Sequence, residues 1–158
     1  MAAETEHRIL VERLPQDCPD EDLDRLAEIE AACFSHPMNV MQIQSLMRSG
    51  PTRFYAARER ADGPIVGSLW AQTVLDEGYI GNVAVHPDNR RRGVGDAMLD
   101  ALEHSARETQ LRFLTLEVRA SNSPAIGLYE KHGYDRVGLR KGYYSDPKED
   151  AVLMTKDF

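Results

Sequence analysis

The spacing of apolar residues changes several times along the chain, between every second position and every third or fourth. A period of about 3.6 residues is typical of an amphipathic helix packed on a core. It predicts four helices: one opening at Pro19-Asp20, one between a cap at Asn39 and a stop at Gly50-Pro51, one from Val94 to about Gln110, and one at 123–133. Asparagine caps and glycine stops are common helix boundaries, which supports these limits.

Runs that alternate with a period of two, or that stay apolar throughout, predict strands. They lie at residues 7–15, 53–59, 65–74, 79–86, 111–119, 134–144 and 150–156. The turn segments ADGP and DEG separate the second, third and fourth runs, as in an antiparallel meander. The order is one strand, two helices, three strands, a helix, a strand, a helix and two strands. It predicts an α+β domain with a mixed, mostly antiparallel sheet flanked by helices.

Length and composition fit one domain. The 158 residues are 42% hydrophobic and 28% charged, as in a globular protein, and contain no internal repeat. We therefore expect a single domain over residues 1–158. No apolar run approaches the roughly 20 residues that cross a bilayer, and the segment MAAETEHRIL lacks the layout of a secretory signal. We expect a cytoplasmic protein with no membrane role.

Charge and potential ligands exclude other classes. The net charge of −7 argues against a nucleic-acid-binding surface and favours a basic substrate. Cys18 and Cys33 are too few for a disulfide framework, so we expect free thiols. The five histidines show no metal-ligand spacing with one another or with the cysteines, and we expect no metal.

The segment RRRGVGD at 90–96 joins a predicted strand to a predicted helix. Three arginines alone also fit a solvated patch. Here, however, glycines allow close backbone approach, a helix N-terminus offers unpaired N–H groups, and arginine adds a planar donor fork. The dinucleotide fingerprint would need a glycine where Met98 stands, and a P-loop would end in Gly-Lys-Ser/Thr. The segment therefore predicts a turn that binds another phosphate-bearing cofactor.

This turn resembles the acetyl-CoA motif Q/R-x-x-G-x-G/A of the GCN5-related N-acetyltransferase (GNAT) superfamily, matched from Arg90 to Gly95. The preceding NVAVHP resembles the strand that pairs with the pantetheine arm in that superfamily. The segments LEVRASNSPAIGLYEKHGY at 116–134 and RKGYYSDPKEDAVLM at 140–154 resemble the bacterial ribosomal-protein-alanine N-acetyltransferase family, RimI. The resemblance covers roughly residues 79 to 154, and the N-terminal half only in its order of elements.

The resemblance implies a GNAT fold with acetyl-CoA as co-substrate. Backbone groups of Val83, Ala84 and Val85 would pair with pantetheine, with an N–H near Val85 facing the thioester oxygen. Asn122 would hydrogen-bond the cofactor, although an asparagine before Ser-Pro also fits a turn or a helix cap. The pyrophosphate would be held by the turn residues Arg90, Arg91, Arg92, Gly93, Val94, Gly95 and Asp96.

Two side chains match the proton-transfer residues of RimI. Glu117 matches the general base, and alternation places it opposite the leucines of its strand, where it also fits a half-exposed charged residue. Because a glutamate of ordinary pKa is a weak base for an ammonium group, partial burial, a bridging water or both would be needed. Tyr129 matches the general acid toward the thiolate, and it also fits a core tyrosine.

The acceptor implied by RimI is a protein N-terminus, namely the alanine of a small-subunit ribosomal protein. Tyr143 and Tyr144 would wall the peptide groove, or would only stabilise the sheet. Two positions depart from the family. Asp96 replaces a basic residue, and its carboxylate would repel a pyrophosphate unless it points away or pairs with an arginine. Met38 follows Pro37 where RimI often has tryptophan.

Three functions stay open from the sequence. The first is acetylation of a protein α-amine, and the second is GNAT acetylation of lysine side chains or small amines, since a fold does not fix the acceptor. The third is a non-catalytic module that senses acyl-CoA, against which the presence of both Glu117 and Tyr129 argues. The oligomeric state and the acyl-chain preference have no signal in the sequence.

Overall fold

The computed structural model describes residues 8–158. Its centre is a seven-stranded sheet in the order β1-β2-β3-β4-β5-β7-β6. The strands are β1 (Leu10–Arg13), β2 (Thr52–Arg58), β3 (Ile65–Val74), β4 (Glu77–Val85), β5 (Phe113–Arg119), β6 (Asp135–Ser145) and β7 (Lys148–Asp157). Neighbouring strands are antiparallel except β4 and β5, which are parallel. The predicted mixed, mostly antiparallel sheet is therefore confirmed.

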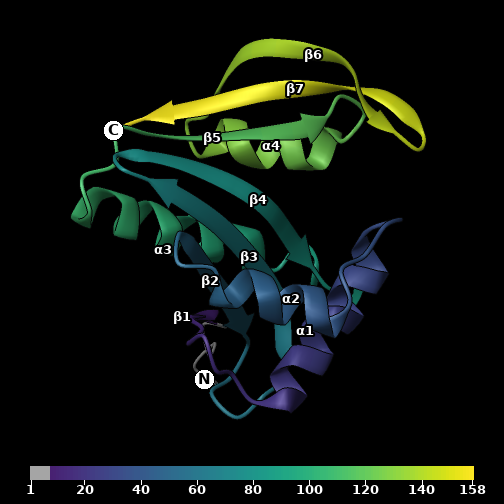
Figure 1. Ribbon diagram of the computed structural model, residues 1–158, viewed down its shortest axis with the longest axis vertical. Helices are drawn as coiled ribbons and strands as arrows, with labels where there is room; N and C mark the ends of the chain where they lie inside the picture. The colour runs from purple at the N-terminus through teal and green to yellow at the C-terminus, as the bar shows by residue number, and fades with distance from the viewer. Residues whose placement is uncertain (1–7) are drawn as a thin grey trace, which may run out of the picture.

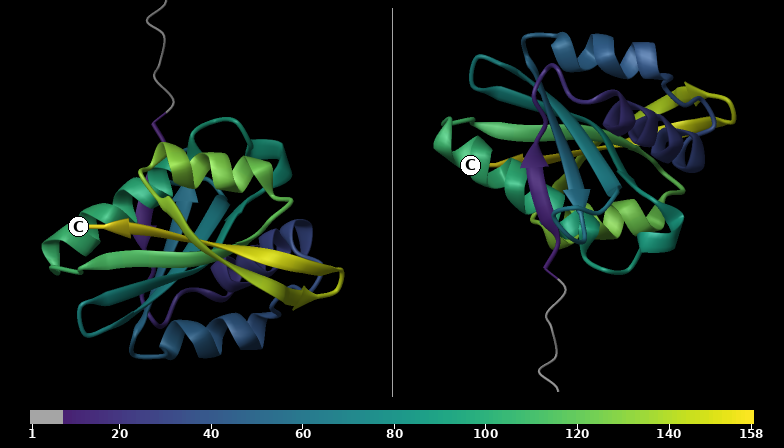
Figure 2. Two further views of the ribbon diagram at one scale, coloured as in Figure 1. Left: turned by 90° about the horizontal axis from the view of Figure 1, so that it is seen from above. Right: turned by 90° about the horizontal axis from the view of Figure 1, so that it is seen from below.

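Four α-helices cover the two faces of this sheet. They are α1 (Asp20–Cys33), α2 (Val40–Arg48), α3 (Val94–Glu108) and α4 (Ser123–Lys131), with a short 3₁₀ helix η1 (Pro87–Asn89). Figure 2 shows α1 and α2 on one face and α3 and α4 on the other. Asn39 caps α2 as predicted: its side chain accepts the backbone N–H of Gln42, and the Gln42 side chain accepts the backbone N–H of Asn39.

The buried apolar residues form one cluster on each face of the sheet. Strand β5 shows how alternating side chains along a strand contribute to these clusters. Leu114, Leu116 and Val118 are buried in the cluster under α3 and α4, whereas Glu117 is on the other face. The first predicted strand is shorter than expected, Leu10–Arg13, and His7 lies outside the described residues.

The sheet divides between β4 and β5. Their ladder has three register pairs, from Glu77 with Phe113 to Tyr79 with Thr115. Beyond Tyr79, β4 continues beside β3 as far as Val85, while β5 continues beside β7 as far as Arg119. Figure 1 shows the two halves spreading apart from this short contact. The facing edges of β4 and β5 thus leave backbone groups available to a ligand.

Candidate active site

A cleft of about 720 Å³ lies beside the free edge of β4. Its walls come from β4, the turn before α3, the first turn of α3, the end of α1, and α4. It brings together most of the predicted site: Val83, Ala84, Val85, Arg90, Arg91, Gly93, Val94, Gly95, Asp96, Asn122 and Tyr129. Arg92 and Glu117 are not among its lining residues.

The turn at the base of the cleft has the geometry of an anion site. Gly93 is the N-cap of α3 and has φ +78°, a left-handed conformation that favours glycine. Because the first intrahelical bond of α3 runs from Ala97 N–H to Gly93 C=O, the N–H groups before it lack helical partners. Such groups, together with the helix dipole, attract phosphate oxygens.

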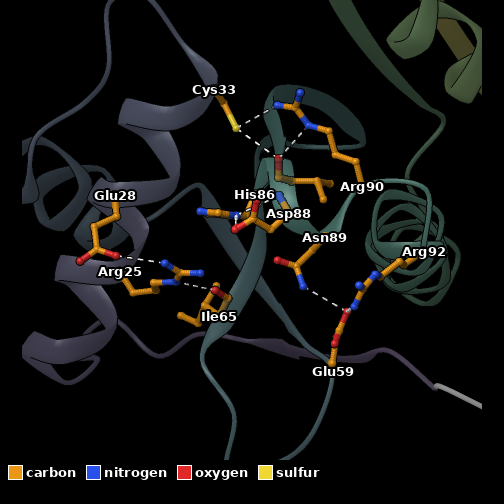
Figure 3. Close-up of polar contacts among 11 residues, drawn as sticks. Arg25, Glu28, Cys33, Glu59, Ile65, His86, Asp88, Asn89, Arg90 and Arg92 are labelled. Atoms are coloured by element: carbon orange, nitrogen blue, oxygen red, sulfur yellow. Dashed lines mark hydrogen bonds and ion pairs between the residues drawn. The ribbon is translucent and has the colours of Figure 1, made fainter.

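The arginines of the turn make different contacts, and Figure 3 shows Arg90 and Arg92 with their partners. Arg90 donates from Nε to the Val85 carbonyl at 3.2 Å, and its Nη2 lies 3.6 Å from the Cys33 sulfur. Arg91 lines the cleft and has a left-handed backbone, φ +63°. Arg92 pairs instead with Glu59, Nη1 to Oε1 at 2.9 Å. The side chain of Arg92 is therefore engaged outside the cleft.

Helix α4 forms the opposite wall of the cleft. A Cβ on Gly95 would lie 3.0 Å from Cδ2 of Leu128, so glycine permits α3 and α4 to approach closely at this point. Asn122 caps α4, because its Oδ1 accepts the Ala125 N–H at 3.3 Å, and it also lines the cleft. Both interpretations of Asn122 are thus compatible with its position.

Tyr129 is a core residue and a cleft residue at once. It is 7% exposed, packs edge-on to Tyr134 with ring centroids 5.7 Å apart, and lines the cleft. Burial, and then the proximity of Tyr144, raises the pKa of Tyr129. Its phenol is therefore protonated at neutral pH and has a proton to donate.

Glu117 lies on the other side of the divided sheet. Its side chain is 11% exposed. Oε2 accepts hydrogen bonds from the hydroxyls of Tyr79 at 2.8 Å and Tyr143 at 3.3 Å, and Oε1 lies 3.5 Å from Nε of Arg140. The partial burial that a glutamate base needs is thus present, in a setting of phenols from β4 and β6.

Sequence reasoning missed Tyr79. It is the last β4 residue paired with β5, opposite Thr115 and therefore next to Glu117 along the sheet. Burial, and then the hydrogen bond to Glu117, raises the pKa of Tyr79, so its hydroxyl remains a donor at neutral pH. A tyrosine in a strand gives no such signal until the strand's partner is known.

Further aromatic and loop residues surround Glu117. The ring of Tyr144 is edge-on to the ring of Tyr143, with centroids 5.0 Å apart. The Cζ atom of Arg119 lies 4.2 Å from the centroid of the Tyr144 ring. Across from this hairpin, His36 of the loop between α1 and α2 pairs with Asp146 at 3.3 Å. This pair joins the loop between α1 and α2 to the turn between β6 and β7.

Met38, the other departure from the family, is held by a buried carboxylate. Its N–H donates to Oε1 of Glu30 at 3.2 Å, and Glu30 is buried in α1. Burial raises the pKa of Glu30, while hydrogen bonds from Met38 and Asn82 oppose that change. Glu30 thus ties the loop between α1 and α2 to β4.

Asp96, the residue expected to repel phosphate, does not pair with an arginine. Its Oδ1 accepts hydrogen bonds from Nε2 of His132 at 2.8 Å and from Nζ of Lys131 at 3.0 Å. Burial opposes ionisation, but the bonds from His132 and Lys131 hold the pKa of Asp96 below its usual value. The partners come from α4, on the same face of the sheet.

One cluster of potential metal ligands occurs among residues 8–158. The ligand atoms of Asp100, Glu103 and His132 lie within 4.8 Å of one another. The sequence did not reveal this group, because His132 is on a different helix from the two acids. Lys156 already places its Nζ 3.2 Å from Oε1 of Glu103 and so supplies a cation there.

The fold and the cleft agree with the protein family that the sequence matches. The model of the acetyltransferase (GNAT) family matches residues 10–134. The chain therefore belongs to the GNAT family and is an acetyl-CoA-dependent N-acetyltransferase. The [ribosomal protein bS18]-alanine N-acetyltransferase of Haemophilus influenzae is 35% identical over 136 residues, which are 84% of this chain and 90% of that protein. The RimI resemblance is thus confirmed.

Two solved structures have the same fold as this chain. The crystal structure of the ribosomal-protein-S18-alanine N-acetyltransferase from Escherichia coli matches with a TM-score of 0.82 and 30% identity, over 95% of this chain and 94% of that chain. Arabidopsis thaliana NAA60 in complex with acetyl-CoA matches with a TM-score of 0.83, over 96% of this chain and 100% of that chain. At 24% identity, the second comparison shows the fold alone. In the described residues, no helix has the length and apolar character needed to cross a membrane.

Proposed function

We propose that this enzyme acetylates the N-terminal α-amine of a protein, with the N-terminal alanine of a small-subunit ribosomal protein as its substrate. By their names, two of the relatives described above are alanine N-acetyltransferases of ribosomal protein bS18 or S18. The observation that carries the proposal is that Tyr129 lines the cleft, while Glu117, 11% exposed and bonded to two phenols, lies on the other face of the divided sheet. An amine that approaches Glu117 and a thioester that lies in the cleft would meet where β4 and β5 separate.

Acetyl-CoA supplies the acetyl group as an activated thioester. The cleft fits it in three respects: a free strand edge for the pantetheine amides, an apolar wall on α4, and unpaired N–H groups with Arg91 for the phosphates. Val83, Ala84 and Val85 bind the pantetheine arm through their backbone groups. An N–H near Val85 stabilises the oxyanion that develops as the amine attacks.

Glu117 and Tyr129 handle the two protons of the reaction. Glu117 takes a proton from the acceptor ammonium, directly or through a water, and thereby frees the attacking lone pair. The donor bonds from Tyr79 and Tyr143 fix the position of its carboxylate. Tyr129 gives its phenolic proton to the departing thiolate, so that CoA leaves as a neutral thiol. The second proton that the nitrogen loses on becoming an amide passes to solvent, which returns a proton to the Tyr129 phenolate.

The acceptor is tested with two peptides incubated with acetyl-CoA and followed by intact mass. One has a free N-terminal alanine and no lysine, and the other is blocked at its N-terminus and contains lysine. We expect one acetyl group on the first peptide and none on the second. Acetylation of only the blocked peptide would move the function to lysine side chains. No transfer to either peptide, with acetyl-CoA bound, would contradict the proposed acceptor.

A further inference from the structure

Asp96 places a negative charge in the first turn of α3, where the cleft is proposed to bind the pyrophosphate. An uncompensated carboxylate there would weaken phosphate binding by repulsion. The structure supplies two donors to the same oxygen, His132 Nε2 at 2.8 Å and Lys131 Nζ at 3.0 Å. These are consecutive residues at the end of α4, so the charge of Asp96 is balanced from the facing helix.

His132 is also held from its other side. Its Nδ1 lies 3.2 Å from Oε1 of Glu103 and 3.6 Å from Oδ1 of Asp100. Because each ring nitrogen faces a carboxylate, the imidazole makes both hydrogen bonds as a donor when it carries two protons. Glu103 is balanced in addition by Lys156. His132 is thus held from both sides and almost buried, with its Nε2 2.8 Å from Oδ1 of Asp96.

We propose that Lys131 and His132 form a cationic clamp that neutralises Asp96 and so permits the turn to bind the pyrophosphate of acetyl-CoA. Both are positioning residues, since they act through Asp96. The clamp also seats α4 against α3 beside the close contact of Gly95 with Leu128. The proposal rests on the placement of acetyl-CoA given above and is independent of the acceptor.

The test compares binding of acetyl-CoA with binding of acetyl-pantetheine, which has no pyrophosphate. Dissociation constants are measured by calorimetry for acetyl-CoA and by NMR titration for acetyl-pantetheine. The variants are His132→Gln, Lys131→Met and Asp96→Asn, with the two double variants that include Asp96→Asn. His104→Gln is the matched control, because His104 lies on α3 and pairs with Glu108. Lys131 is 69% exposed, so its variant reports on the clamp even if His132→Gln fails to fold.

We expect His132→Gln and Lys131→Met each to raise the dissociation constant of acetyl-CoA about tenfold. Each variant leaves the charge of Asp96 less balanced beside the partly screened pyrophosphate. Binding of acetyl-pantetheine should stay within twofold. Asp96→Asn should tighten acetyl-CoA binding a few-fold and should abolish the losses in the double variants. Losses that persist beside Asp96→Asn, losses shared by acetyl-pantetheine, or no loss at all would overturn the clamp. By contrast, unchanged acetyl-CoA binding in Arg91→Ala would contradict the placement of the cofactor itself.

Discussion

Replacing Glu117 by glutamine separates the proposed catalytic role of this side chain from its structural role. Glutamine has nearly the same size and still offers a carbonyl oxygen to the Tyr79 hydroxyl, which donates to Glu117 at 2.8 Å. It cannot take a proton from an ammonium group. It also loses the 3.5 Å pairing with Arg140, whose side chain is 56% exposed.

The expected loss of folding stability is much smaller than the expected loss of reaction rate. An ion pair with a half-exposed arginine contributes roughly 0.2–1 kcal/mol to stability, and the neutral amide weakens the bond from the Tyr79 hydroxyl only in part. The free energy of unfolding should therefore fall by about 1 kcal/mol, or about 2–4 °C in Tm for a chain of this length. Loss of a general base costs about 10²- to 10⁴-fold in rate, or about 2.7–5.4 kcal/mol.

The assay measures thiol release at saturating acetyl-CoA, beside a thermal melt and a calorimetric dissociation constant for acetyl-CoA. We expect kcat to fall at least a hundredfold, while acetyl-CoA binds within twofold of the wild-type value, because Glu117 does not line the cleft. Tyr79→Phe is the matched variant: it keeps the carboxylate and removes one donor, so its loss should be smaller. A kcat within fivefold of wild type, or a loss explained by weaker acetyl-CoA binding, would refute Glu117 as the base.

Three further predictions follow from the cleft and the core. Tyr129→Phe should lower kcat by about 10²-fold or more with little change in acetyl-CoA affinity, because only the proton donor is removed; equal loss of both would contradict its role as acid. Arg91→Ala should raise the acetyl-CoA dissociation constant several-fold in calorimetry, whereas Arg92→Ala, which loses a pairing outside the cleft, should change it less than twofold. Burial raises the pKa of Tyr134, so the unfolded chain releases that proton first as pH rises past about 10. Its contribution to stability is complete below that pH and should decrease above it in denaturant titrations.

Local patterns predicted most of the fold. The alternation in β5 placed Glu117 opposite the buried leucines, and Asn39 marked the start of α2. These features depend on neighbours within a few residues, which a sequence displays directly. The short parallel ladder of β4 and β5 was not predicted, because it depends on contacts between segments more than thirty residues apart. The same limit hid the 3₁₀ helix η1, whose three residues carry no period.

The turn of the candidate site was predicted, because backbone conformation and chain order define it. Gly93 and its neighbours form the expected turn at the start of α3. The partners of individual side chains were harder to predict from the sequence. Asp96 was expected to point away from the phosphate or to pair with an arginine, and its partners are His132 and Lys131. Tyr79 had no signal at all, since its role depends on lying beside Glu117 across two strands. Charges are balanced by whichever groups the fold brings near, and the sequence order does not reveal them.

The three-residue ladder between β4 and β5 also affects how firmly the two parts of the sheet are held together. Within the sheet, β6 and β7 are joined to the first four strands through β5 alone. A ligand that lies along the edge of β4 and touches α4 adds a second connection between these two blocks. A ligand in the cleft should thus also reduce the motion of the hairpin that carries Tyr143 and Tyr144.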